Sequence, residues 1–121
     1  EPVDAAWPTV LITGRQLEHW HTGAMTRRSA VLDALEPAAV ATLAPAELTR
    51  LGLAPGAALS IETRRGRITL AARADPLMPA GMVFVPFCYV EAAANLLTNP
   101  ALDPYGKIPE FKYAACRLAP A

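Results

Sequence analysis

The sequence of 121 residues predicts a mainly β fold, a small β-barrel with short inserted helices. Short apolar runs recur along the chain, and Gly and Pro residues separate them, as in all-β domains. Two neighbouring runs, residues 59–63 and 68–72, alternate apolar and polar side chains, which is typical of strands with one buried face. Helical patterns are confined to a few short segments.

Strands are predicted, in chain order, at residues 10–13, 40–43, 59–63, 68–72, 82–87 and 112–118. The first two are short apolar runs that suit a buried sheet. The two alternating runs are joined by Arg64-Arg65-Gly66, which predicts a tight hairpin with its cations in solvent. Residues 82–87 are almost entirely apolar, and this predicts a strand buried on both faces.

Helices are predicted, in chain order, over residues 30–35, 46–51 and 90–97. Ser29 can cap the first helix, and Pro37 ends it. Pro45 occupies the first turn of the second helix, and Gly52 closes it. The third is an apolar segment that contains Asn95, a polar residue that is costly to bury without a partner. Residues 1–8 are interpreted as a linker, with Trp7 packing on the domain.

The amino-acid composition excludes several classes of protein. Hydrophobic residues make up 53% of the chain and charged residues 18%, which excludes a disordered protein. The net charge is zero, so nucleic acid is not a predicted partner. No apolar run approaches the ~18 residues of a membrane span, so no membrane insertion is expected. Cys88 and Cys116 are too far apart for a CxxC motif and are interpreted as buried thiols.

The most informative segment covers residues 12–28, ITGRQLEHWHTGAMTRR, which begins at the end of the first predicted strand. It is rich in cations, hydrogen-bond donors and glycine, and it carries one Trp. These groups suit an anionic, planar, hydrogen-bonding ligand. Two alternatives remain: His19 and His21 could bind a metal with Glu18 as third ligand, or the segment is a surface loop packed by Trp20.

Five ordered blocks of the sequence resemble the C-terminal molybdopterin-dinucleotide-binding domain of the dimethyl sulfoxide reductase family. They are residues 13–23, residues 51–66, VFVPF at 83–87, NLLT at 95–98, and DP at 103–104 with PEFK at 109–112. The resemblance implies a six-stranded double-psi β-barrel. It also implies that residues 1–121 form one domain, the C-terminal fragment of a larger catalytic subunit.

The resemblance further implies a bis-molybdopterin guanine dinucleotide with molybdenum or tungsten, held by Thr13, Gly14, Arg15, Glu18, His19, Trp20, His21, Thr22, Asn95 and Lys112. Phe87 would lie by the substrate path, where nitrate reductases of the family have Trp. No catalytic residue and no metal ligand is expected in this chain. The metal-coordinating residue and any iron–sulfur cluster belong to preceding domains, so the isolated domain is expected to be inactive.

Formate dehydrogenase is the preferred activity of the full-length enzyme, because the blocks after Asn95 look most like those enzymes. Nitrate reductase is the second candidate, because residues 19–28 are similar to the nitrate enzymes. A free-standing barrel that binds a small ligand or a protein is the non-enzymatic alternative. Expected partners are the remaining domains of the same subunit and electron-transfer subunits, and the expected compartment is the cytoplasm. For Arg15, an exposed ion pair with Glu18 is the alternative to a cofactor contact.

Overall fold

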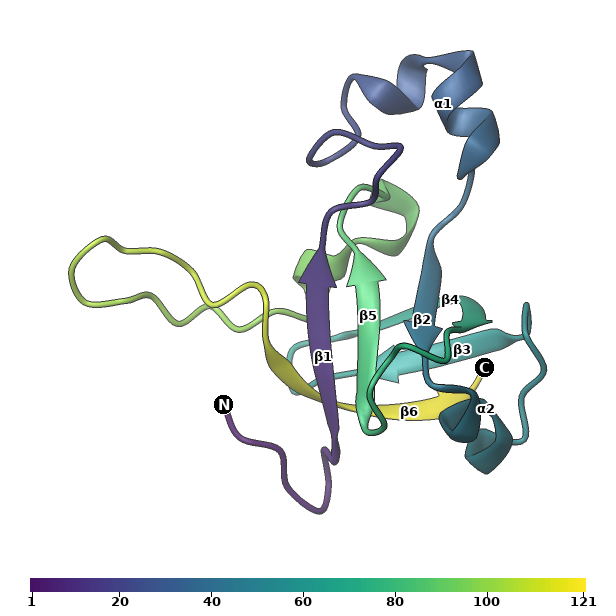
Figure 1. The fold of residues 1–121 in the computed structure, drawn as a ribbon. Helices are drawn as coiled ribbons and strands as arrows, with labels where there is room; N and C mark the ends of the chain where they lie inside the picture. Colours follow the sequence, from purple (N-terminus) through teal and green to yellow (C-terminus); the bar gives the residue numbers. More distant parts are fainter.

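The computed structural model describes residues 1–121 and shows a closed six-stranded barrel with short helical insertions (Figure 1). The neighbouring strands follow the order β1-β5-β2-β4-β3-β6 around the barrel. The strands are β1 (Thr9–Gly14), β2 (Val40–Leu43), β3 (Ala58–Glu62), β4 (Arg67–Ala74), β5 (Met82–Pro86) and β6 (Ala114–Pro120). The helical elements are η1 (Thr26–Arg28), α1 (Ala30–Leu35), α2 (Pro45–Leu51), η2 (Val90–Ala92) and η3 (Ala94–Leu96).

The barrel mixes parallel and antiparallel pairs. β1 runs parallel to β5 and β2 runs parallel to β4, while the other four neighbouring pairs are antiparallel. Inward-facing side chains alternate along the strands and fill the interior, with Leu11, Leu59, Ile61 and Val83 fully buried. The predicted fold class, a mainly β six-stranded barrel with short helices, is confirmed.

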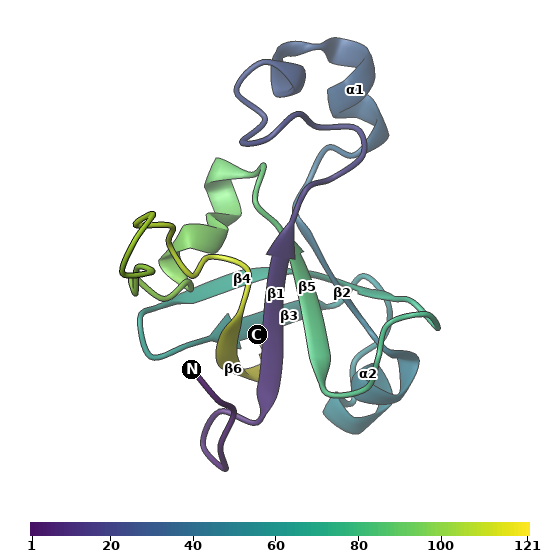
Figure 2. The same cartoon turned by 60° about the vertical axis from the view of Figure 1, so that its left-hand side comes forward.

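Three connecting segments meet at one end of the barrel. Because β1 and β5 are parallel and Gly14 pairs with Pro86, the chain leaves both strands at the same end. β6 runs antiparallel to β1, and its first residue, Ala114, pairs with Leu11 in the middle of β1. The preceding Phe111 accepts a hydrogen bond from the Thr13 hydroxyl, so the chain enters β6 from that same end. Residues 15–36, which we call the lobe, rise above this end, and residues 98–113 extend to the side (Figures 1 and 2). The fold therefore brings segments distant in sequence to one surface.

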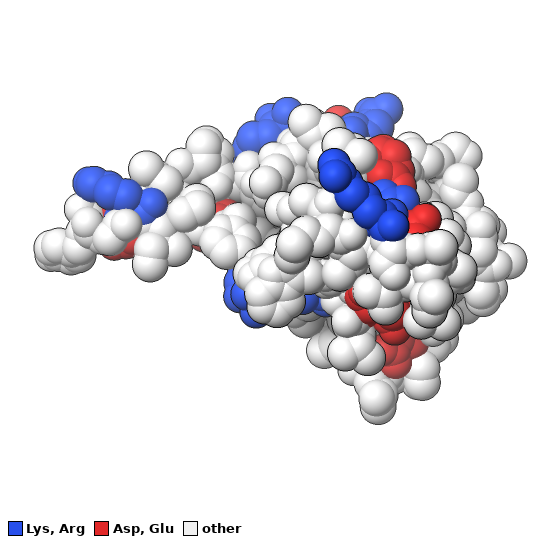
Figure 3. Space-filling view, turned by 90° about the horizontal axis from the view of Figure 1, so that it is seen from above, with Lys and Arg blue, Asp and Glu red and all other residues white.

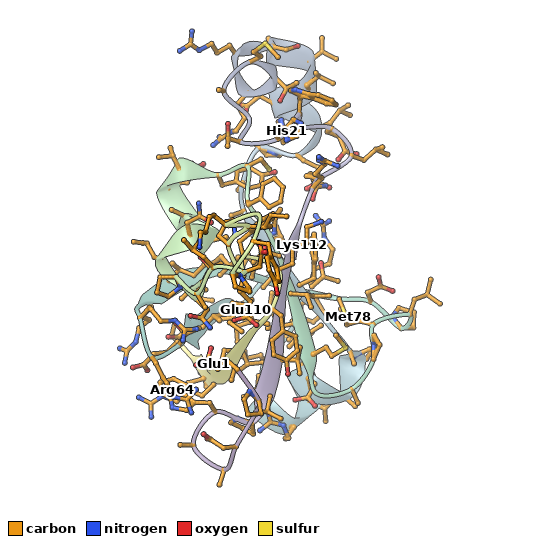
Figure 4. The ribbon with its side chains drawn as sticks, turned by 90° about the vertical axis from the view of Figure 1, so that its left-hand side faces the viewer. Glu1, His21, Arg64, Met78, Glu110 and Lys112 are labelled. Atoms are coloured by element: carbon orange, nitrogen blue, oxygen red, sulfur yellow. The ribbon has the colours of Figure 1, made fainter.

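The predicted hairpin is confirmed, but its arginines do not lie free in solvent. β3 and β4 pair from Ala58–Ala71 to Glu62–Arg67 across a short turn. The guanidinium of Arg64 forms ion pairs with Glu1 and Asp4, and that of Arg65 donates to Glu1 and to the carbonyl of Leu97. Figure 4 shows Glu1 and Arg64 lying close together. The arginines thus attach the N-terminal segment to the barrel.

Trp7 packs on the domain as expected. The guanidinium carbon of Arg117 lies 4.8 Å from the centroid of the Trp7 ring, and that of Arg64 lies 5.4 Å from it. Two cations packed on the Trp7 ring hold the segment before β1 in place.

Removing the Glu1 carboxylate is expected to destabilise the fold at neutral pH and not in strong acid. The hydrogen bond from Arg65, together with Arg64, lowers the pKa of Glu1 to about 2. A depressed folded-state pKa contributes stability above the unfolded value of about 4.3, and this stability is lost as the pH falls toward 2. Glu1→Gln should therefore cost about 1–2 kcal/mol at pH 7, and the difference from wild type should shrink between pH 4 and pH 2 in urea unfolding. A constant difference across that range would contradict the ion-pair assignment.

The predicted helix over residues 90–97 is wrong. The segment forms two 3-10 turns, η2 and η3, separated by Ala93 in an extended conformation. Ala92, Ala94 and Leu97 are all buried. Residues two apart point to nearly opposite sides of an α-helix, so one helix could not bury both alanines on the same face. Packing against the barrel therefore overrides the helical pattern.

Three smaller predictions also need correction. The last strand begins at Ala114 and not at Lys112, which lies in the preceding loop. β5 is not buried on both faces: Val83 and Val85 are buried, whereas Phe84 is half-buried because its face lies at the outside of the barrel. Ser29 precedes α1 but makes no side-chain capping bond.

Candidate cofactor-binding site

Two open pockets flank the end of the barrel where the connecting segments meet. The first, which we call the lobe pocket, has a volume of about 650 Å³ and is lined by Arg15, Gln16, Leu17, Glu18, His19, Trp20, Thr26 and Leu32. The second, the loop pocket, has a volume of about 440 Å³ and is lined by Phe87, Asn95, Thr98, Asn99, Pro100, Pro109 and Phe111. Of the predicted site residues, Arg15, Glu18, His19 and Trp20 line the lobe pocket, and Phe87 and Asn95 line the loop pocket. The two pockets share no lining residue.

Arg15 is exposed in the lobe pocket and has no partner within the chain. It follows Gly14 at the end of β1 and forms neither an ion pair nor a side-chain hydrogen bond. The alternative ion pair with Glu18 is not formed. Glu18 instead accepts a hydrogen bond from Nε2 of Gln16 at 2.8 Å, which lowers the pKa of the Glu18 carboxyl. The guanidinium is therefore available to a ligand.

His19 is a structural residue with both ring nitrogens engaged. It is buried, its Nε2 donates to the carbonyl of Glu36 at 2.9 Å, and its Nδ1 lies 3.2 Å from Oγ1 of Thr26. A carbonyl oxygen can only accept, so Nε2 carries the proton in this arrangement. His19 thus holds the floor of the lobe pocket, and its side chain has no nitrogen left for a metal.

Trp20 and His21 lie on the outer part of the lobe. The Trp20 side chain is exposed, although its backbone N–H donates to Oγ1 of Thr26 at 3.0 Å. His21 is exposed with a positive φ of 49°, and its ring meets that of Trp20 edge to face at 4.4 Å. Since His19 is buried and His21 stacks outside, the two rings do not form a common metal site. Thr22 is exposed and lines a smaller pocket of about 310 Å³ with Arg28 and Cys88.

Thr13 and Gly14 join the segments to one another. Thr13 is buried and its hydroxyl donates to the carbonyl of Phe111. The backbone N–H of Phe87 donates to the carbonyl of Gly14 at 3.1 Å. A Cβ at Gly14 would lie 2.8 Å from the ring of Phe84, so the strand end has no room for a larger residue unless that ring shifts. These two residues place Phe87 and Phe111 beside the end of β1.

Asn95 and Lys112 reach the same end of the barrel from different segments. Asn95 is exposed and its side-chain amide makes no hydrogen bond within the chain, so the expectation that it is buried in a helix is wrong. Lys112 is exposed, and its ammonium lies 5.8 Å from the centroid of the Phe111 ring without a carboxylate partner. Figure 4 shows Lys112 beside β1, below the part of the lobe that carries His21. Both donors are free for a ligand.

The structure also reveals residues that the sequence did not single out. Tyr89 is buried against the lobe, where its hydroxyl donates to the carbonyl of Glu36 at 2.8 Å, and burial raises its pKa. Arg27 was counted among the cations of the ligand-like segment, but its guanidinium is bound by Glu91 and Asp33. The sequence shows that Arg27 is positively charged but not what it pairs with, because its partner Glu91 lies 64 residues away.

The free groups at this end fit an anionic dinucleotide. They are a guanidinium, an exposed indole, an amide and an ammonium, contributed by Arg15, Trp20, Asn95 and Lys112. A guanidinium suits a pyrophosphate, an indole offers a stacking face, and an amide can pair with a heterocyclic edge. Seen from above, most of this face of the molecule is uncharged, and some of its basic and acidic side chains adjoin one another (Figure 3). No group of three or more His, Cys, Asp or Glu residues could hold a metal ion, and no helix is long and apolar enough to span a membrane.

Comparison with known proteins identifies relatives of the whole fold. Residues 9–115 match the family described as molybdopterin dinucleotide binding domain. The chain is 40% identical over 119 residues to the F420-dependent formate dehydrogenase 1 subunit alpha of Methanococcus maripaludis, covering 98% of this chain and 18% of that protein. It is 41% identical over 117 residues to the F420-dependent formate dehydrogenase subunit alpha of Methanocaldococcus jannaschii, covering 95% of this chain and 17% of that protein.

A solved structure shows the same fold. Acetylene hydratase from Pelobacter acetylenicus superposes with a TM-score of 0.83 at 20% sequence identity, over 95% of this chain and 18% of that chain. The chain therefore spans less than a fifth of the length of these relatives.

Proposed function

Because the chain belongs to the molybdopterin dinucleotide-binding domain family, we propose that it holds a bis-molybdopterin guanine dinucleotide in a molybdenum or tungsten formate dehydrogenase. In this proposal residues 1–121 are one domain of a larger catalytic subunit, and the other domains of that subunit are its direct partners. Electron-transfer subunits would bind elsewhere on the subunit, and any iron–sulfur cluster would lie outside this chain. The proposed compartment is the cytoplasm.

The observation that supports cofactor binding best is the convergence of unpaired donors. Arg15 comes from the segment after β1, Asn95 from η3 after β5, and Lys112 from the loop before β6. These residues are exposed, and none forms an ion pair or a side-chain hydrogen bond with a polar group of the chain. A fold that gathers free donors from three segments at one end is suited to an extended polyanionic ligand.

Each residue has a proposed part in holding the cofactor. Arg15 pairs with a phosphate or a pterin edge, and Trp20 covers a flat ring. Asn95 and Lys112 hold the part of the ligand nearest the loop pocket, and Thr13, Gly14 and His19 keep these segments in place. When bound, the cofactor supplies the metal centre at which formate is oxidised. The residues of this chain bind and orient that group and exclude water from its edge.

Formate is the proposed substrate because both curated relatives at about 40% identity are named formate dehydrogenase subunits. The test is formate-dependent dye reduction by the full-length protein, with nitrate reduction measured in parallel. Turnover of formate alone supports the proposal, and turnover of nitrate alone would overturn the substrate assignment. The isolated chain should show neither activity, because it offers no metal-ligand cluster.

Asn95→Ala in the full-length protein should lower cofactor retention without lowering stability. The exposed amide makes no hydrogen bond within the domain, so its removal should leave the free energy of unfolding within about 0.5 kcal/mol of wild type. Loss of its hydrogen bonds to the ligand should weaken binding by about 1–3 kcal/mol, measured as metal and pterin per polypeptide after dialysis. Thr69→Ala, an exposed change on the outside of β4, is the control. Equal retention in both variants would remove Asn95 from the site.

A further inference from the structure

The helix of the lobe has no buried core that would fix the position of the lobe on the barrel. Its helix α1 buries no residue, and it packs chiefly on η1 inside the lobe. Figures 1 and 2 show the lobe standing clear of the barrel, joined to it by the ends of β1 and β2. Yet the lobe carries Arg15 and Trp20, which line the lobe pocket. Contacts with the rest of the domain must fix its angle to the barrel, and one of them is the ion pair of Arg73 in β4 with the Glu36 carboxylate at 3.1 Å.

Arg27 provides such a contact. Its Nη1 lies 2.7 Å from each carboxylate oxygen of Glu91 in η2, and its Nε donates to Asp33 of α1 at 3.0 Å. Its Nη2 donates to the carbonyl of Pro37 at 3.2 Å. The guanidinium carbon lies 4.8 Å from the centroid of the Tyr89 ring. One side chain therefore joins α1, the approach to β2 and the segment after β5.

The position of Arg27 is connected to the lining of the lobe pocket. Thr26, the preceding residue, accepts the backbone N–H of Trp20 and contacts Nδ1 of His19. His19 and Tyr89 both donate to the carbonyl of Glu36, and their rings meet edge to face at 5.6 Å. Movement of Arg27 away from Glu91 would therefore shift the floor of the lobe pocket relative to η2 and η3.

We propose that Arg27 is a positioning residue that clamps the lobe to η2 through Glu91 and so sets the spacing between the lobe pocket and the loop pocket. Arg27 makes its hydrogen bonds within the protein, whereas Arg15 and Asn95 are free to bind the ligand. Its effect on cofactor binding rests on the proposed function, whereas its effect on the lobe does not. Nη1, Nε and Nη2 each bind a different partner, so the clamp requires a guanidinium, since the one nitrogen of an ammonium cannot occupy all three positions.

The test compares Arg27→Gln, Arg27→Lys and Glu91→Gln with the control Arg28→Gln in the full-length protein. Arg28 is exposed and makes no ion pair or side-chain hydrogen bond. Amide hydrogen exchange of residues 15–36 is followed by mass spectrometry, beside metal content and the rate at which the pterin is released. Loss of the clamp should speed exchange in the lobe and release of the pterin about tenfold, while exchange in β3 and β4 is unchanged. Arg28→Gln should change neither rate.

The outcomes separate the clamp from a general effect on stability. Arg27→Lys retains the charge and should fold, with an exchange rate between those of wild type and Arg27→Gln. Glu91→Gln, which changes the partner of Arg27 and not the lobe itself, should speed exchange in the lobe and not in β3 and β4, a pattern that a merely destabilised barrel would not give. Unchanged lobe exchange in Arg27→Gln, or equal acceleration in lobe and barrel, would overturn the proposal. A wild-type protein without pterin would overturn the proposed function, and lobe exchange would still decide the clamp.

Discussion

Arg15→Lys in the full-length protein is expected to reduce cofactor occupancy several-fold while the fold stays intact. Arg15 is exposed at the end of β1, lines the lobe pocket and forms no ion pair within the chain. Within the domain, lysine can therefore replace Arg15 without loss of an interaction. A planar guanidinium can make two parallel hydrogen bonds to a phosphate, and an ammonium cannot. Losing one charged hydrogen bond should weaken binding by about 1.5–3 kcal/mol.

The measurement is metal and pterin per polypeptide, with the thermal midpoint recorded on the same samples. Arg50→Lys is the matched control, because Arg50 is exposed on α2 and pairs only with Glu47 of the same helix. Figure 1 shows α2 at the opposite end of the barrel from the lobe. Wild-type occupancy in Arg15→Lys would show that this guanidinium does not bind the cofactor in two-pronged fashion.

Gly23→Ala is expected to destabilise the domain by about 2–4 kcal/mol. Gly23 has a φ of 77°, which costs a side chain about 1–2 kcal/mol. A Cβ there would lie 2.6 Å from the backbone carbonyl oxygen of Cys88 and 2.8 Å from Cγ of Arg27. The carbonyl belongs to the segment after β5 and cannot move cheaply. The lobe should therefore be displaced from the barrel at the place where Arg27 holds it.

Gly52→Ala separates the strain from the clash. Gly52 ends α2 with a similar φ of 68°, but nothing lies within 4 Å of a Cβ built there. It should cost only about 1 kcal/mol in urea unfolding. If both variants lost the same stability, the close approach between Gly23 and the Cys88 carbonyl would not contribute to the loss.

The barrel could be predicted from the sequence because its signals are local. The alternating residues of β3 and β4 and the turn between them specify a hairpin without distant information. The helix over residues 90–97 failed for the opposite reason. Ala92, Ala94 and Leu97 face a core formed by strands far away in the chain, and that packing overrides the local pattern.

The site was partly predictable for the same reason. Donors such as Arg15 and Trp20 stood out, because a cluster of cations and an aromatic residue after a strand suggests a ligand. Which of these residues bind a ligand and which hold the fold together could not be predicted, since that depends on partners distant in the sequence. Arg27 looks like a ligand residue until Glu91 is placed beside it, and His19 looks like a metal ligand until Glu36 and Thr26 are found to occupy its nitrogens.

We propose that this domain holds a molybdopterin guanine dinucleotide, and cofactor analysis of the purified full-length protein tests that proposal most directly. Acid and iodine oxidation would release a fluorescent pterin, nucleotide analysis would identify the base, and elemental analysis would measure molybdenum and tungsten. We expect one of these metals with about two guanine nucleotides for each metal atom, in line with a bis-dinucleotide cofactor. A protein that contains neither pterin nor guanine nucleotide after expression in a host that makes the cofactor would contradict the claim.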